Sequence, residues 1–132
     1  KTPRELVARA KSKPGELAFG SGGTASPAHL AMELFMQKAG IRMNHVPYKG
    51  GAPALTDLAG GQIQVLVNPA LSATPLIKTG RIRAIAVTGP ARSDLMKDLP
   101  TVSEAGWPGY EVTTWYGLFA PAKTDMAVVR RV

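Results

Sequence analysis

Three times along this sequence, a short apolar segment ends in a turn of glycine, proline or polar residues, and a helical pattern follows. The apolar segments cover residues 17–19, 43–46 and 63–67, and the turns after them run through residues 20–26, 47–52 and 68–69. Strands that alternate with helices in this way are typical of a parallel sheet with right-handed crossovers. The repeat therefore predicts an α/β fold, a mostly parallel sheet flanked by helices.

The helices of this pattern are marked by capping residues. Thr2 and Glu5 form a capping box that begins a first helix, which ends at Pro14-Gly15. Ser26 as N-cap and Pro27 at the first helical position begin a second helix. Further helices are predicted from Pro53 to Gly60, over residues 70–78, over one turn from Thr101 to Gly106, and from Thr124 to the chain end, where the pattern looks cut short.

Beyond residue 80 the sequence predicts three more strands, over residues 83–87, 110–113 and 116–119. The chain has 132 residues, which is enough for one compact domain and too short for two. We therefore expect a single α/β lobe over residues 1–132.

Composition excludes several classes of protein. The chain has no cysteine, which excludes disulfides, a thiolate nucleophile and cysteine-based metal sites. No acidic pair or histidine cluster has the spacing of metal ligands, so neither a metal nor a cofactor is expected. No apolar run approaches the roughly 18 residues that cross a bilayer, and residues 1–13 do not have the pattern of a secretory signal.

The net charge of +7 first suggests a nucleic-acid binder. Residues 1–13 and 123–132 together hold eight basic and two acidic residues, whereas the stretch between them holds eight basic and seven acidic residues. The excess charge therefore lies at the two ends, where no aromatic residues interleave with it to stack on bases. We expect no nucleic-acid partner.

The three turns of the repeat carry the chemistry. Each follows the carboxyl end of a strand and precedes a helix, so the turns are expected to meet at one edge of the sheet. Helix N-termini present unpaired N–H groups and the positive end of the helix dipole, which suit an anion such as a carboxylate. Gly22 and Gly23 allow close backbone approach, hydroxyl groups come from Ser21, Thr24 and Ser26, and Gly50 and Gly51 make a second cradle.

Other interpretations of these residues stay open. Residues 20–25 fit a G-x-G-x-x-A dinucleotide template, but His45 stands where an acidic residue would bind the ribose. Ser21, His29 and Asp57 could be combined as a hydrolase triad, although nothing in the sequence fixes their geometry. His29 could be a polar residue at the start of a helix or could contact a ligand. Lys49 could simply be solvated or could take part in binding. His45 is expected to be structural, and Trp115 and Tyr116 could line a cleft or pack in a core.

Five segments also resemble a known family. They are residues 19–26 (FGSGGTAS) with His29-Leu30, residues 45–55 (HVPYKGGAPAL), residues 83–87 (RAIAV), residues 99–106 (LPTVSEAG) and residues 115–117 (WYG). They are similar to the substrate-binding receptors of tripartite tricarboxylate transporters, the Bug or TctC-like family. The second and fourth segments together are long enough to be specific, whereas the glycine loop alone is not.

The resemblance implies one lobe of a type II periplasmic-binding-protein fold, whose two lobes close on a carboxylate-bearing solute. It implies that this chain is the second lobe, that the first lobe is absent from the sequence, and that the partners are the first lobe and membrane permease subunits in the periplasm. Family receptors hold carboxylates through backbone N–H, hydroxyl and water contacts. The expected binding residues are Ser21, Gly22, Gly23, Thr24, Ser26, His29, Tyr48, Lys49, Gly50, Gly51 and Asn68.

Two positions depart from the family's pattern. Ala25 stands where the family often has glycine, and Asn68 stands where it often has aspartate. The shape and polarity of the binding edge therefore differ, and the solute stays unnamed. We expect a non-enzymatic receptor lobe that captures a small di- or tricarboxylate. The alternative is an anion- or nucleotide-binding enzyme domain.

Overall fold

The computed structural model describes residues 2–131 and contains a three-stranded parallel sheet with strand order β2-β1-β3. The central strand β1 (Ala18–Ser21) pairs with β2 (Asn44–Pro47) on one side and with β3 (Val65–Leu66) on the other. Phe19 lies opposite His45 on β2 and opposite Val65 on β3. The predicted α/β fold with a parallel sheet is confirmed.

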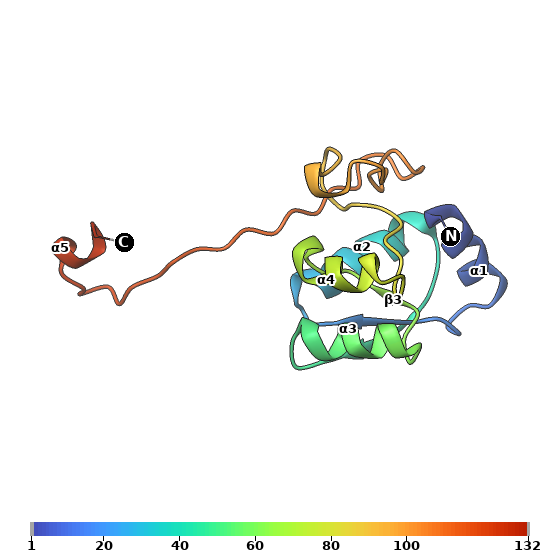
Figure 1. The fold of residues 1–132 in the computed structure, drawn as a ribbon, viewed down its shortest axis with the longest axis horizontal. Helices are drawn as coiled ribbons and strands as arrows, with labels where there is room; N and C mark the ends of the chain where they lie inside the picture. Colours follow the sequence, from blue (N-terminus) through green and yellow to red (C-terminus); the bar gives the residue numbers. More distant parts are fainter. Residues whose placement is uncertain (1, 132) are drawn as a thin grey trace.

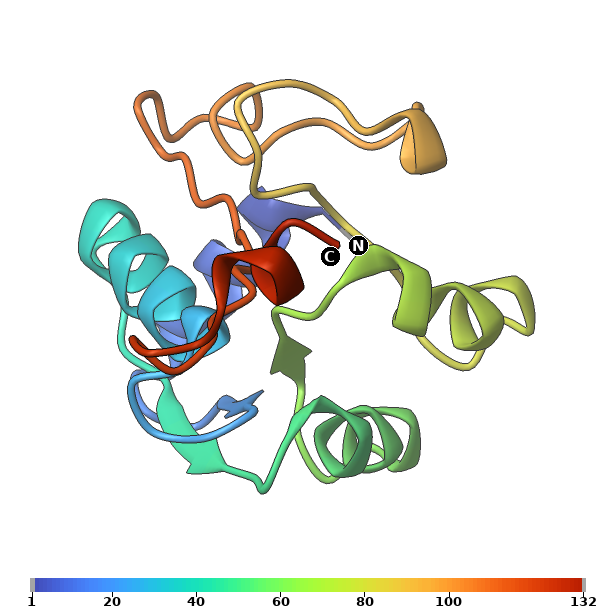
Figure 2. The same cartoon turned by 90° about the vertical axis from the view of Figure 1, so that its left-hand side faces the viewer.

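Helices cover both faces of this sheet (Figures 1 and 2). α1 (Pro3–Ser12) and α2 (Pro27–Ala39) lie on one face, and α3 (Gly51–Gly60) lies on the other (Figure 2). α4 (Ala70–Lys78) follows β3, and two short elements complete the chain, the 3-10 helix η1 (Asp94–Met96) and α5 (Met126–Val129). The predicted capping residues act as expected, since Thr2 accepts from the N–H of Glu5 and Ser26 accepts from the N–H of His29.

The main core lies between the sheet and the helices α1 and α2. Phe19 is fully buried in it, and Phe35 of α2 packs edge-on against Tyr110. The Tyr110 hydroxyl donates to the Ala31 carbonyl at 3.0 Å, and burial raises the pKa of Tyr110 to about 12. On the opposite face, a Cβ at Gly20 would lie 2.5 Å from the Ile63 side chain. The end of the Ile63 side chain therefore packs directly on the backbone of β1 at Gly20, and a larger residue there would have to displace it.

Three predicted strands are wrong. Residues 83–87 form an isolated parallel bridge between Val87 and Thr101 rather than a strand, and residues 110–113 and 116–119 have no strand structure. The Val112 N–H donates to the Thr88 carbonyl at 2.8 Å, so isolated backbone hydrogen bonds hold this region in place of a strand ladder. A strand requires a continuous partner, which β propensity alone does not supply.

The one-turn helix predicted from Thr101 is also absent, although its capping box forms. The Thr101 N–H donates to the Glu104 carboxylate at 2.9 Å, and the Glu104 N–H donates to the Thr101 hydroxyl at 3.0 Å. The residues between them form turns. The first of these bonds, together with Arg92, lowers the pKa of Glu104.

The C-terminal segment, residues 113–131, extends away from the body of the molecule (Figure 1). Its apolar side chains are exposed, among them Trp115, Tyr116, Leu118 and Phe119 at 79% to 88%. The helix expected from Thr124 is present as α5. Within residues 2–131, no helix is both long and apolar enough to cross a membrane.

Candidate functional site

The three turns that follow β1, β2 and β3 contact one another at the carboxyl edge of the sheet. The Gly50 N–H donates to the Gly22 carbonyl at 3.2 Å, which joins the first turn to the second. A Cβ at Gly51 would lie 2.7 Å from Oδ1 of Asn68, so the second turn also touches the third. We call this edge the rim. The predicted meeting of the turns is present in the structure.

The helices α2, α3 and α4 all begin at the rim, on the side toward which the C-terminal segment extends (Figures 1 and 2). α2 is capped by the Ser26 side chain, whose Oγ accepts from the His29 N–H at 3.3 Å. The N-cap positions of α3 and α4 are Gly50 and Pro69, and neither makes a side-chain capping bond. The N-termini of α3 and α4 therefore bring partial positive charge to the rim without a side chain that neutralises it.

The glycine loop, residues 22–26, is supported from below by Ser21. Ser21 is fully buried, and its Oγ lies 2.9 Å from the Gly23 carbonyl, 3.2 Å from the Gly23 N–H and 2.6 Å from Nε2 of His45. Thr24 is exposed, and Ala25 has φ of 61° in the left-handed region. An alanine there is strained, whereas the glycine common in the family would not be.

Both histidines lie beneath this loop. The rings of Phe19, His45 and His29 stack, with 3.9 Å between the centroids of the two imidazoles. Nδ1 of His29 accepts from the Ala25 N–H at 3.0 Å, and its Nε2 lies 3.4 Å from the Glu33 carboxylate. Burial and then the neighbouring His29 lower the pKa of His45, while Glu33 opposes this shift.

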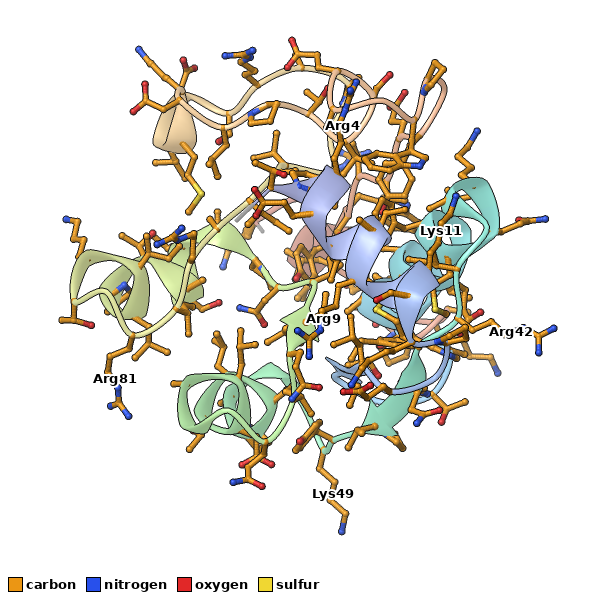
Figure 3. All side chains as sticks on the ribbon, turned by 90° about the vertical axis from the view of Figure 1, so that its right-hand side faces the viewer. Arg4, Arg9, Lys11, Arg42, Lys49 and Arg81 are labelled. Atoms are coloured by element: carbon orange, nitrogen blue, oxygen red, sulfur yellow. The ribbon has the colours of Figure 1, made fainter. Side chains whose placement is uncertain are left out.

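The second turn presents backbone rather than side-chain groups to the rim. The Tyr48 hydroxyl donates to Asp57 at 2.7 Å, and this hydrogen bond, with burial, raises the pKa of Tyr48. Lys49 is exposed and its side chain points outward from the body (Figure 3). On the third turn, Nδ2 of Asn68 donates to Ser72 at 2.7 Å, which turns Oδ1 of Asn68 toward Gly51.

The residues considered for a hydrolase triad do not assemble. Ser21 pairs with His45 instead of His29, and Asp57 pairs with Tyr48. Because Ser21 is fully buried, a substrate could not reach its hydroxyl. Residues 2–131 contain no group of three or more histidine, aspartate or glutamate side chains suited to a metal ion.

The sequence predicted a structural His45, and it did not predict the contact of His45 with Ser21 beneath the loop. The register of the sheet explains this contact. His45 on β2 lies opposite Phe19 on β1, and β1 ends at Ser21. Trp115 and Tyr116, which were considered for a cleft or a core, lie in the exposed C-terminal segment and occupy neither.

Comparison with known proteins matches the whole chain to one family. The family model described as "Tripartite tricarboxylate transporter family receptor" matches residues 1–132. The protein BugT of Bordetella pertussis is 36% identical over 124 residues, which are 94% of this chain and 38% of BugT. A protein encoded in the tcbD-tcbE intergenic region of Pseudomonas sp. strain P51 is 39% identical over 129 residues, 97% of this chain and 38% of its own length.

Solved structures agree with the sequence comparison. An R. palustris protein solved with adipate has a TM-score of 0.95 and 38% identity, and MatC from Rhodopseudomonas palustris with bound malate has a TM-score of 0.90 and 29% identity. The periplasmic binding protein BugD has a TM-score of 0.91 and 32% identity. Each match covers 98% of this chain and 44% of the solved chain, so the fold described above is that of one lobe of such proteins.

Proposed function

Since the chain belongs to the TctC family of tripartite tricarboxylate transporter receptors, we propose that it is the lobe of a receptor that binds a small organic carboxylate at the rim. The observation that carries this proposal is the contact of three turns at the N-termini of α2, α3 and α4. Adipate and malate, the compounds named with two of the similar structures, are both dicarboxylates. A dicarboxylate is therefore the solute class that we propose.

The family is one of substrate-binding receptors and not of enzymes. The alternative of an anion- or nucleotide-binding enzyme domain therefore receives no support from the comparisons. The Ser21 hydroxyl, the nucleophile considered for such an enzyme, is buried and engaged by Gly23 and His45.

We assign the ligand contacts to the parts of the turns that face the rim. Backbone N–H groups at the start of α3 and the Thr24 hydroxyl are suited to donate to a carboxylate, whereas the Asn68 amide already donates to Ser72 and to the Pro69 carbonyl. The residues we propose for direct contact are Gly22, Thr24, Ser26, Gly50 and Gly51, and Asn68 holds the third turn beside Gly51. Ser21, Gly23, His29 and Tyr48 are engaged within the protein and support the turns, and Lys49 acts at longer range through its charge.

The rim supplies only part of a binding site. The chain spans 38% of the length of BugT, and we propose that a further lobe closes over the rim when the solute binds. Receptors of this family are periplasmic, and we propose the same location for this one, with membrane permease subunits as the recipients of the solute.

A titration tests the proposal. The full-length receptor that contains this chain is titrated with adipate, malate and a tricarboxylate while the fluorescence of Trp107 and Trp115 is followed. Saturable binding of one carboxylate supports the proposal, whereas no response to any of them, with binding of a nucleotide instead, contradicts it. For the 132-residue chain alone we expect two or three charge-assisted hydrogen bonds and a Kd of about 1 mM. Micromolar affinity of the chain alone would contradict a site divided between two lobes.

A further inference from the structure

Three stacked rings beneath the glycine loop join β1, β2 and α2. The centroids of Phe19 on β1 and His45 on β2 lie 4.9 Å apart, and those of His45 and His29 on α2 lie 3.9 Å apart with their planes 9° from parallel. Phe19 is fully buried, and the His29 side chain is only 17% exposed. The stack therefore fixes both imidazoles directly below the first turn of the rim.

The three contacts of the Ser21 hydroxyl determine which nitrogen of His45 carries the proton. A hydroxyl has one hydrogen and two acceptor sites. The Gly23 carbonyl can only accept, so the hydrogen of Ser21 lies toward it, and the Gly23 N–H occupies one acceptor site. The remaining site must accept from Nε2 of His45 at 2.6 Å. Nε2 of His45 therefore carries a proton and donates to Ser21, and in the neutral ring this is the Nε2–H tautomer.

The contacts of His29 lead to the same tautomer at the other end of the loop. Nδ1 of His29 accepts from the Ala25 N–H at 3.0 Å, so this nitrogen carries no proton. The proton of the neutral ring is on Nε2, which lies 3.4 Å from the Glu33 carboxylate. Ala25 has φ of 61°, a conformation that residues with a side chain rarely adopt, and the bond to His29 holds it there.

We propose that His29 and His45 are positioning residues that hold the two ends of the glycine loop, with Thr24 left at the tip to contact the ligand. His45 acts through Ser21 on Gly23, and His29 acts directly on Ala25. The N–H groups of Gly23 and Ala25 are both turned inward by these bonds, whereas Thr24 between them is exposed. Neither imidazole contacts the solute. The identity of the solute rests on the proposed function, but the two assigned tautomers do not.

Nuclear magnetic resonance tests the tautomers without any ligand. The imidazole nitrogen and carbon shifts of the chain are measured near pH 7.5, in the wild type and in Ser21→Ala. We expect both histidines as the Nε2–H tautomer, and we expect the signals of His45 to move in S21A because its acceptor is lost. A proton on Nδ1 of either ring, or His45 signals that S21A leaves unchanged, would overturn the assignment.

Binding measurements in the full-length receptor test the consequence for the ligand. In His45→Phe the ring stack remains but the donor to Ser21 is lost, and we expect adipate or malate affinity to fall by about tenfold. In His45→Gln an amide N–H replaces the imidazole donor, and we expect the affinity to recover to within about threefold of the wild type. Affinity in H45F equal to that of the wild type would overturn the proposal.

Tyr110→Phe serves as the matched control. It also removes one buried hydrogen bond, but at the Ala31 carbonyl within the core, away from the turns of the rim. We expect it to lower the melting temperature and to leave the carboxylate affinity unchanged. If Y110F weakened binding as much as H45F, the effect would be a general loss of stability and the proposal would be wrong.

The two proposals fail in different ways. If the wild-type receptor binds none of the carboxylates, the proposed function fails, and the positioning role is decided by amide hydrogen exchange of Gly23 and Ala25. Faster exchange of the Gly23 amide in H45F and of the Ala25 amide in His29→Phe would support it, because the end of the loop that each histidine holds is then released. Exchange as slow as in the wild type would overturn it. If H45F does not fold, S21A provides the same comparison at the Gly23 end.

Discussion

The body of the molecule and its C-terminal segment are both rich in apolar residues but place them in opposite environments. In the body, Phe19 is 0% exposed and lies on a strand with a partner on each side. In the C-terminal segment, Phe119 is 88% exposed and has no strand beside it. An aromatic residue therefore stabilises this fold only where a neighbouring element covers it. Four predictions test or refine this contrast, and each uses a matched variant where the chain offers one.

The largest difference is expected between two phenylalanine truncations. Phe19→Ala removes a fully buried ring between β1 and the helices, and we expect the free energy of unfolding to fall by about 3 to 5 kcal/mol. Phe119→Ala removes a ring that lies in solvent, and we expect a change within about 0.5 kcal/mol. Urea unfolding of the 132-residue chain measures both. A large loss in F119A would show that the C-terminal segment packs on the body in solution.

The next effect concerns the rim. Gly22→Val places methyl groups toward Gly50, whose carbonyl carbon already lies 3.5 Å from the position of a Cβ at Gly22. We expect the two turns to separate and carboxylate affinity of the full-length receptor to fall by about tenfold, with the fold retained. Gly60→Ala, where a Cβ would meet nothing within 4 Å, is the control and keeps its affinity. Unchanged affinity in G22V would argue against the first turn as part of the site.

A smaller difference in stability is expected between the substitutions of two tyrosines. Tyr110→Phe loses the hydrogen bond to Ala31 and costs about 1 kcal/mol near neutral pH, whereas Tyr116→Phe in the exposed segment changes the stability little. Because burial raises the pKa of Tyr110 to about 12, its contribution to stability is present below pH 10 and is lost as the pH rises through about 12. Unfolding free energies of the wild type and Y110F are measured between pH 9 and 12. The wild type should lose more stability than Y110F over this range, because Y110F has no hydroxyl that ionises at position 110.

The smallest effect is the pH dependence contributed by His45. Its pKa is lowered by burial and by His29, so the folded state binds its proton less readily than the unfolded chain does. The stability from neutral His45 is present above its ordinary pKa of about 6.5 and is lost as the pH falls through the lowered value. The difference in unfolding free energy between the wild type and H45F is measured from pH 8 to 5. A difference that is constant with pH would contradict this prediction.

Local features of the fold were predictable from the sequence. The capping pairs at Thr2 and at Thr101, the N-cap at Ser26 and the glycine turn all involve residues within about four positions of each other. The three predicted strands that failed, over residues 83–87, 110–113 and 116–119, depend on a partner that lies elsewhere in the chain. A high β propensity permits a segment to form a strand, but the strand forms only where another strand pairs with it.

The candidate site divides in the same way. The sequence by itself determined that three turns with glycine, hydroxyl and amide groups precede helices, because turn residues and capping residues act on the backbone beside them. Tertiary structure alone decided that Ser21 bonds to His45, 24 residues away, and that His29 lies stacked on it. These contacts depend on the register of β1 with β2 and on the path of the crossover through α2, and neither is fixed by any interaction between residues close together in the sequence.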